Sequence, residues 1–148
     1  MYSISKALPQ DIVGITTLAY ETLPERYTPG LFNQLYETYP QGIFVAKIGS
    51  RIIGFLISIK THETQARILM VGVQKNYRRN GIATQLLRKY IISAIGQNIR
   101  IIDLEVRTTN QPAIIFYQKM GFTIQELIKG FYPNGTDAYT MRLWLQTY

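Results

Sequence analysis

The chain reads Asn76-Tyr77-Arg78-Arg79-Asn80-Gly81-Ile82-Ala83-Thr84-Gln85-Leu86-Leu87 between two apolar segments. The short apolar run Ile68 to Val73 precedes this stretch, and an amphipathic segment follows it. This order predicts a strand, a basic turn and the first turn of a helix. Free backbone N–H groups and the positive end of the helix dipole point out of such a turn, so it favours phosphate. Gly81 lets a ligand approach the backbone closely, and Ala83 is too small to block a pyrophosphate.

The order Arg-x-x-Gly-x-Ala in this turn resembles the acyl-CoA pyrophosphate loop of the GNAT superfamily of N-acetyltransferases. The turn lacks the Gly-Lys-Ser/Thr of a P-loop and the GxGxxG of a dinucleotide-binding fold. The resemblance implies acetyl-CoA as cosubstrate. It also implies that the cosubstrate contacts Arg78, Arg79, Asn80, Gly81, Ile82, Ala83 and Thr84.

A second segment, Leu104 to Phe122, resembles the GNAT core pattern Leu-x-Val-x-x-x-Asn-x-x-Ala-x-x-x-Tyr-x-x-x-Gly-Phe. The resemblance implies that the strand 69–73 splays away from the strand 101–106, with the pantetheine arm between them. The arm would pair like an added strand with the backbone of Val71, Gly72 and Val73. One N–H group there would polarise the thioester carbonyl.

The same resemblance assigns roles to two side chains of the second segment. Asn110 would hold the pantetheine arm from the side opposite the strand 69–73. Tyr117 would place its phenol near the sulfur and stabilise or protonate the departing thiolate. The alternative for Tyr117 is an aromatic side chain that only packs in the core.

The remaining periodicities predict an α/β chain in a single domain covering residues 1–148. Strands are expected at 2–7, 43–48, 52–60, 66–73, 101–106, 123–129 and 137–145, with 101–106 as a strand of the buried type. Helices are expected at 9–23, from a Thr28-Pro29 start through Tyr39, from the basic turn to Gly96, and at 111–120. The GNAT resemblance implies a mixed, mostly antiparallel sheet of about seven strands with a splayed parallel pair, flanked by four helices.

Composition excludes several kinds of site. The chain of 148 residues has no cysteine, which excludes disulfides, thiolate metal sites and an acyl-cysteine intermediate. Its single histidine, His62, lies in a polar stretch and is expected to be exposed, so a histidine-based zinc site or a serine triad is disfavoured. We therefore expect no metal.

The net charge of +7 suits a polyanionic ligand, and equally RNA or a position near the ribosome. The basic residues are scattered, which argues against nucleic-acid binding as the main function. No apolar run approaches the roughly 20 residues that span a bilayer, and Met1 to Lys6 does not resemble a signal peptide. A cytoplasmic protein without a membrane partner is expected, and a monomer and a homodimer both remain open.

Three short segments point to a peptide amino terminus as the acceptor. Residues 21–27 resemble the Leu-Pro-Glu-x-Tyr loop of the catalytic subunits of NatA-type amino-terminal acetyltransferases and their archaeal relatives. Residues 131–139 resemble the Tyr-Tyr-x-x-Gly-x-Asp-Ala-Tyr segment of the same group. Leu-Glu-Val-Arg at 104–107 is shared with that group and with bacterial ribosomal-protein alanine acetyltransferases. The resemblance implies substrate contacts at Leu23, Pro24, Glu25, Tyr27, Phe131 and Tyr132.

Two positions depart from the pattern of the group. Phe131 replaces the first tyrosine of the pair, so a hydroxyl contact to the peptide is lost there and Tyr132 would carry it. Arg67 stands where some relatives place a tyrosine or histidine base. Because an arginine cannot accept a proton at neutral pH, the base role moves to the glutamates.

Elementary acid–base chemistry supports an α-amine acceptor. With a pKa near 8, about one α-amine in ten is neutral at pH 7, against about one lysine in a few thousand. Glu25 or Glu105, acting through a water molecule, is therefore an adequate base for an α-amine. A small-amine or lysine ε-amine acetyltransferase remains the alternative within the enzyme class. A non-catalytic acyl-CoA-binding or ribosome-associated module is the alternative from another class.

Overall fold

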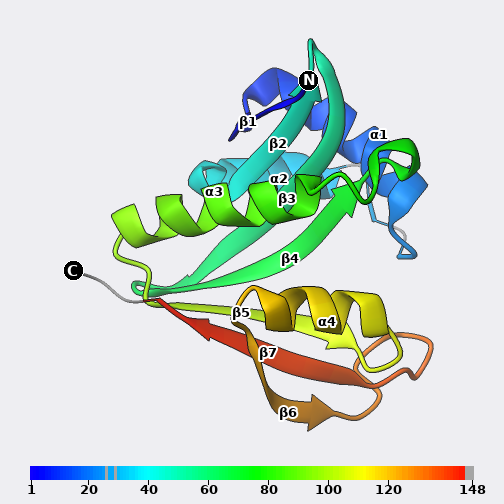
Figure 1. Ribbon diagram of the computed structural model, residues 1–148, viewed down its shortest axis with the longest axis vertical. Coiled ribbons are helices and arrows are strands. Elements are labelled where there is room, and N and C mark those ends of the chain that lie inside the picture. Colours follow the sequence, from blue (N-terminus) through cyan, green and yellow to red (C-terminus); the bar gives the residue numbers. More distant parts are fainter. Residues whose placement is uncertain (26, 29, 146–148) are drawn as a thin grey trace.

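The fold is built on one seven-stranded mixed sheet with helices on both faces, as the computed structural model shows (Figure 1). The structure describes residues 1–25, 27–28 and 30–145. The strands are β1 (Ser3–Lys6), β2 (Ile43–Ile48), β3 (Arg51–His62), β4 (Gln65–Val73), β5 (Ile101–Arg107), β6 (Thr123–Ile128) and β7 (Ala138–Trp144). The helices are α1 (Ile12–Thr22), α2 (Gly30–Thr38), α3 (Ile82–Gly96) and α4 (Gln111–Lys119), with 3-10 turns at η1 (Pro9–Asp11), η2 (Pro40–Gly42) and η3 (Lys75–Tyr77).

The element order and types confirm the α/β architecture expected from the sequence. The helix predicted from Pro9 begins as the 3-10 turn η1, and the α-helix starts only at Ile12. Pro29, predicted as the first residue of the second helix, lies outside the described residues. His62 ends β3 and is exposed, as expected. Among the described residues, no helix is both long and apolar enough to span a lipid bilayer.

The strand order in the sheet is β1-β2-β3-β4-β5-β7-β6. Among these neighbours, β4 and β5 form the parallel pair, and the other pairs are antiparallel. A parallel pair needs a long crossover connection, and α3 supplies it here. In Figure 1, α3 and α4 lie in front of the sheet, whereas α2 lies behind it.

Two hydrophobic cores stabilise the two faces of the sheet. The first core packs α3 against the sheet through Leu86, Leu87 and Tyr90, which are at most 1% exposed. The second core packs α1 and α2 against the opposite face, with Ile15 and Phe32 at its centre. Each fully buried side chain of this size contributes about 1.5–3 kcal/mol to the stability of the fold. The two cores therefore stabilise the sheet even where neighbouring strands are not fully paired.

The parallel pair is short. β4 and β5 pair from Gln65 to Arg67, opposite Ile101 to Asp103, and the two strands separate beyond that point (Figure 1). The sequence predicted that the strand 69–73 separates from the strand 101–106. In the structure this separation begins directly after Arg67. Beyond it, within the described chain, β4 keeps β3 as its strand partner on one side and has none on the other.

A β-bulge lies at the start of the separated part of β4. Met70 pairs with Ile57 and Ile68 pairs with Ser58, which leaves Leu69 as an extra residue. A bulge reverses the alternation of side chains, so Ile68 packs in the core with α3 while Met70 packs in the core with α1. Leu69 itself is left 39% exposed.

The strand predicted as buried at 101–106 is fully buried on one face only. Ile102, Leu104 and Val106 are buried, whereas the alternate residues of β5 are only partly buried. Those alternate positions carry Asp103 and Glu105, whose charges need solvent or a partner. β5 is an edge of the separated region, and its second face therefore remains accessible to charged neighbours.

Candidate active site

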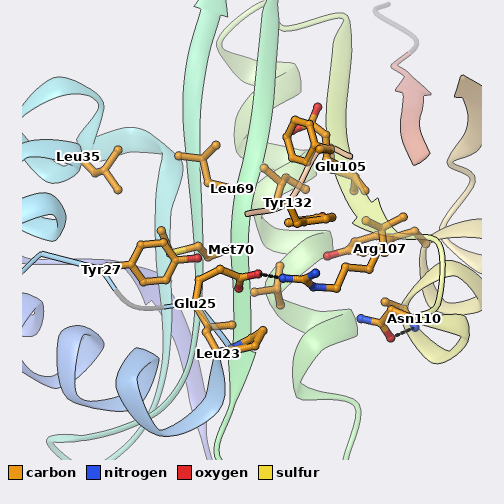
Figure 2. Close-up of a pocket in the computed structure, with 18 of the residues that line it drawn as sticks. Leu23, Glu25, Tyr27, Leu35, Leu69, Met70, Glu105, Arg107, Asn110 and Tyr132 are labelled. Atoms are coloured by element: carbon orange, nitrogen blue, oxygen red, sulfur yellow. Dashed lines mark hydrogen bonds and ion pairs between the residues drawn. The ribbon is translucent and has the colours of Figure 1, made fainter. Parts of the chain in front are cut away.

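The separated strands border a cavity of about 490 Å³. Its walls come from the α1–α2 loop, α2, β4, β5, α4 and the β6–β7 loop (Figure 2). All six residues predicted to bind substrate line it, and so do the predicted Val71, Glu105, Asn110 and Tyr117. The fold therefore brings together side chains from both halves of the chain at the place where the sheet opens.

A second cavity of about 490 Å³ lies at the amino terminus of α3. It is lined by Val71, Gly72, Val73, Arg78, Arg79, Gly81, Ile82, Ala83 and Thr84 from the predicted cosubstrate set. Val71 lines both cavities, so both border the separated part of β4. Asn80 is the one predicted turn residue that does not line the second cavity.

The β4–α3 turn owes its shape to two left-handed residues. Arg79 has φ of 67° and Gly81 has φ of 75°, and a Cβ atom added at Gly81 would meet no atom within 4 Å. The Asn80 amide donates back to the carbonyl oxygens of Tyr77 and Arg78, at 3.1 and 3.4 Å, so Asn80 holds the turn. The open backbone at Gly81 leaves the first N–H groups of α3 accessible to an anion.

Arg78 and Gly72 connect this turn to β4. The Arg78 Nε–H donates to the carbonyl oxygen of Val73 at 3.1 Å, which fixes the guanidinium beside the end of β4. A Cβ atom on Gly72 would lie 2.6 Å from Phe55 Cε1 and 2.9 Å from Thr22 Oγ1. The close approach of α1 and β3 therefore requires glycine at this position, independently of any ligand.

Asn110 caps α4 with one end of its amide. Its Oδ1 accepts the backbone N–H of Ala113 at 3.3 Å, and this contact orients the side chain. The amide nitrogen is on the side that faces the cavity (Figure 2). The cap thus leaves an N–H donor available to a ligand between β4 and α4.

Tyr117 is held by aromatic neighbours. Its ring packs edge-to-face against Phe116 and Phe122, with centroid distances of 5.1 and 5.4 Å. Burial raises the pKa of the Tyr117 phenol well above its ordinary value of 10, and the nearby Tyr132 raises it further. The phenol therefore stays protonated throughout the physiological range and can donate its proton or a hydrogen bond into the cavity.

Glu105 lines the cavity from β5 and is mostly buried, with 14% of its side chain exposed. Burial raises the pKa of its carboxyl, Arg67 lowers it, and Asp103 raises it. The Arg67 Nε lies 3.5 Å from Glu105 Oε2. A carboxylate in this setting can accept a proton from an amine or a water molecule in the cavity.

Glu25 and Arg107 face one another across the mouth of the cavity and form an ion pair (Figure 2). The Arg107 guanidinium also stacks on the ring of Tyr132, 3.9 Å from its centroid, and donates to Asn134 Oδ1 at 3.2 Å. Arg107 thus ties the α1–α2 loop to the β6–β7 loop. The Glu25 carboxylate is engaged in this ion pair, whereas the Glu105 carboxylate lines the cavity.

Arg107 lines the cavity and was not among the residues predicted for the site. It belongs to the Leu-Glu-Val-Arg stretch, but no role was assigned to it. Strand alternation was the available signal, because Arg107 must share the face of Glu105 two residues earlier. Its partner Glu25, 82 positions away, could not be read from that alternation. Within the described residues, no group of three His, Asp or Glu side chains is placed to hold a metal ion.

Comparison with known proteins agrees with this geometry. The sequence profile of the Acetyltransferase (GNAT) family matches residues 12–122. The chain belongs to the GNAT acetyltransferase family. This GNAT acetyltransferase is 33% identical to an N-alpha-acetyltransferase of Saccharolobus solfataricus, over 95% of this chain and 91% of that protein.

Solved structures of similar proteins superpose on nearly the whole GNAT domain. Ard1 from Thermoplasma volcanium is 32% identical, with a TM-score of 0.93 over 98% of each chain. Arabidopsis thaliana Naa50, solved in complex with the bisubstrate analogue CoA-Ac-MVNAL, is 25% identical. Its TM-score is 0.84, and the match covers 97% of this chain and 99% of that one.

Proposed function

We propose that this acetyltransferase moves the acetyl group of acetyl-CoA directly to the N-terminal α-amine of a protein or peptide, within a ternary complex. The observation that carries the proposal is that two cavities, with different linings, both border the separated part of β4 at Val71. One cavity opens at the amino terminus of α3, and the other opens between the α1–α2 and β6–β7 loops. Two substrates that enter from these two mouths would meet beside Glu105 and Tyr117.

The cavity at α3 fits the cosubstrate. The accessible N–H groups after Gly81 and the guanidinium groups of Arg78 and Arg79 suit a pyrophosphate. The side of β4 that lacks a strand partner beyond Arg67 suits an extended amide-containing arm, which would pair with the backbone near Val71 and Val73. Asn110 would donate to the same arm from the start of α4.

The other mouth fits an extended peptide. A third cavity of about 690 Å³ shares Pro24, Glu25, Tyr27 and Arg107 with the first one, so the space continues outward from the mouth. Leu23, Phe131 and Tyr132 would pack against the first residues of the peptide. The relatives named N-alpha-acetyltransferase and the peptide-like analogue bound to Naa50 support this assignment.

In the reaction we propose, Glu105 accepts a proton from the α-ammonium group, directly or through a water molecule. The neutral amine then attacks the thioester carbonyl carbon, and a C–N bond forms. A backbone N–H of the 71–73 segment would stabilise the negative charge on the carbonyl oxygen. When the C–S bond breaks, the Tyr117 phenol would stabilise the thiolate or donate its proton to it. The attached amine loses its second proton as the C–S bond breaks. Of the two protons that the amine loses, one ends on the CoA thiol, directly or by reprotonating Tyr117, and the other leaves to solvent. Glu105 thereby returns to the carboxylate, so charge and atoms balance.

The strength of the base favours an α-amine over a lysine side chain. A carboxylate can deprotonate an amine with a pKa near 8 far more readily than one near 10.4. Acetylation of a small amine or of a lysine therefore remains the second candidate. A module that binds acyl-CoA without turnover is the third.

A thiol-release assay with acetyl-CoA separates these candidates. The panel contains peptides that begin with Ser, Ala, Met-Leu and Met-Glu, the same peptides with blocked amino termini and an internal lysine, and spermidine as a small amine. Mass spectrometry locates the acetyl group. We expect acetylation of at least one free amino terminus and none of the blocked peptides. Faster modification of internal lysine or spermidine would contradict the proposal, and CoA binding without any turnover would favour the module.

A further inference from the structure

Arg67 is the last residue of β4 that pairs with β5. Its partner in the register is Asp103, and Glu105 follows two residues later on the same face of β5. Arg67 therefore lies at the point where the sheet opens, with one carboxylate beside it and a second at the start of the cavity. Which of the two carboxylates it binds decides its role.

Asp103 already has another partner. The Arg142 guanidinium donates to both of its oxygens, with Nε–Oδ1 of 2.7 Å and Nη2–Oδ2 of 3.0 Å. This two-point contact satisfies Asp103 from β7. The guanidinium of Arg67 is thus left for Glu105, and its Nε lies 3.5 Å from Oε2. A shift of a few tenths of an ångström would turn this ion pair into a hydrogen bond.

The Nε atom of Arg67 has no alternative partner. It is buried, and among the described residues it finds no hydrogen-bond acceptor, although 41% of the side chain as a whole is exposed. A buried donor without a partner is costly, which favours the approach of Nε to Glu105. The exposed remainder of the guanidinium keeps its hydration, so Arg67 stays charged at low cost.

The other charged groups around Glu105 do not supply this interaction. Asp103 on β5 is neutralised by Arg142, and Arg107 on β5 is committed to Glu25 of the α1–α2 loop. The β6–β7 loop contributes the phenol of Tyr132, and β7 presents the uncharged Thr140 opposite Glu105. Among the described groups, Arg67 is the cation that directly contacts the Glu105 carboxylate.

We propose that Arg67 is a positioning residue for acetyl transfer, which keeps the Glu105 carboxylate ionised and binds Oε2 so that Oε1 is left for the acceptor. The inference rests on the proposed role of Glu105 as the base. Its physical reason is that burial alone would favour the protonated carboxyl, which cannot accept a proton from the amine. An adjacent guanidinium offsets that effect, and it extends the active range of the enzyme to lower pH.

A titration of Glu105 tests the ion pair without any need for turnover. The carboxyl carbons of the glutamates are labelled with ¹³C, the Glu105 signal is assigned with Glu105→Gln, and its shift is followed from pH 3 to 9 by NMR. Arg67→Met should raise the pKa of Glu105 by about one pH unit, and Arg67→Lys should raise it less. Arg100→Met removes an exposed arginine just before β5 and should not change it. An unchanged or lowered pKa in Arg67→Met would overturn the inference.

The pH dependence of kcat/KM links the ion pair to the reaction. The acidic limb of the pH profile should move to higher pH in Arg67→Met, by the same amount as the pKa of Glu105 in the NMR titration. The loss of kcat/KM relative to wild type should therefore be largest near pH 6 and smallest near pH 8.5. A deficit that is equal at every pH would assign Arg67 a merely structural role and overturn the inference. Should wild-type protein acetylate no amino terminus while the NMR shift is present, the proposed function fails but the control of Glu105 by Arg67 stands.

Discussion

Glu25 and Arg107 are joined by an ion pair that ties the α1–α2 loop to the end of β5 across the cavity mouth (Figure 2). Arg107 continues the link by stacking on Tyr132 in the β6–β7 loop. Two loops that would otherwise be separate walls thus become one rim. Since the rim borders both the first cavity and its outward continuation, it lies where a peptide would have to pass.

Breaking this rim should weaken peptide binding and leave acetyl-CoA binding unchanged. Both side chains of the pair are partly exposed, at 22% and 27%, so their coupling is expected to be about 1 kcal/mol. Arg107→Met should therefore raise KM for the peptide about fivefold or more, because the stacking on Tyr132 is lost as well. Steady-state kinetics with the peptide and calorimetry with CoA provide the measurement.

A double-mutant cycle with Glu25→Gln and Arg107→Met isolates the pair. The double variant should bind the peptide only slightly worse than Arg107→Met alone, since the interaction is already broken. Additive losses would mean that the two residues contact the peptide independently. Weakened CoA binding in either variant would contradict the assignment of the rim to the peptide side.

Gly81→Glu should abolish the binding of acetyl-CoA without unfolding the protein. The new carboxylate would face a pyrophosphate at the amino terminus of α3, and we expect affinity to fall on the order of a hundredfold or more. Gly49→Glu is the matched control, because Gly49 has φ of 60° and equally open space in the β2–β3 hairpin. Both variants should lose about 1 kcal/mol of stability from the left-handed backbone. Equal CoA affinity in the two would refute the turn assignment.

Tyr117→Phe should lower kcat more than it weakens CoA binding. The phenol is proposed to serve the thiolate only as the C–S bond breaks, so its loss should cost on the order of a hundredfold in kcat. Since the pKa of Tyr117 is raised, the wild-type phenol remains protonated and should add no alkaline limb below pH 10. Tyr90→Phe, in the core beneath α3, removes a phenol away from the cavity and should leave kcat unchanged. A Tyr117→Phe enzyme with normal kcat would mean that the ring only packs.

Glu105→Gln and Glu25→Gln distinguish the base from the rim. Glu105→Gln should reduce kcat/KM on the order of a hundredfold at pH 7 and recover towards pH 9, because more of the α-amine is then already neutral. In wild-type enzyme the rate should fall as the pH drops through the raised pKa of Glu105, since the protonated carboxyl cannot act as a base. Glu25→Gln should instead show a deficit in peptide affinity that is constant from pH 6.5 to 9. Full activity of both variants would leave deprotonation to bulk water and refute the mechanism.

Much of the fold could be predicted because local patterns carry it. The basic turn with Gly81 sits between a strand and a helix in the structure as in the prediction, and the element order holds along the chain. Gly81 is readable from sequence since only glycine adopts its φ of 75° without strain. The strand at 101–106 was predicted as buried, but the sequence did not show that only one of its faces is fully buried. That difference depends on which neighbours cover each face.

The partners of the charged residues were decided by the tertiary structure. Glu25, Glu105, Asn110 and Tyr117 were predicted as site residues from their motifs, and the fold places all of them on one cavity. The sequence does not say that Arg142 takes Asp103, or that Arg67 is thereby left for Glu105. Such a choice depends on strand register, which places both Arg67 and Arg142 opposite Asp103.

The sequence by itself determined the order of helices and strands, the basic turn with Gly81 and the residue types available for chemistry. Order and turn depend on backbone preferences within a few residues. Only the tertiary structure decided where β4 and β5 separate, that Val71 borders two cavities, and that Arg107 closes the rim with Glu25. These features arise between residues far apart in the chain. The energy of an ion pair or of a cavity contact depends on distances and burial. Packing of the two cores sets these quantities, and no local sequence pattern encodes them.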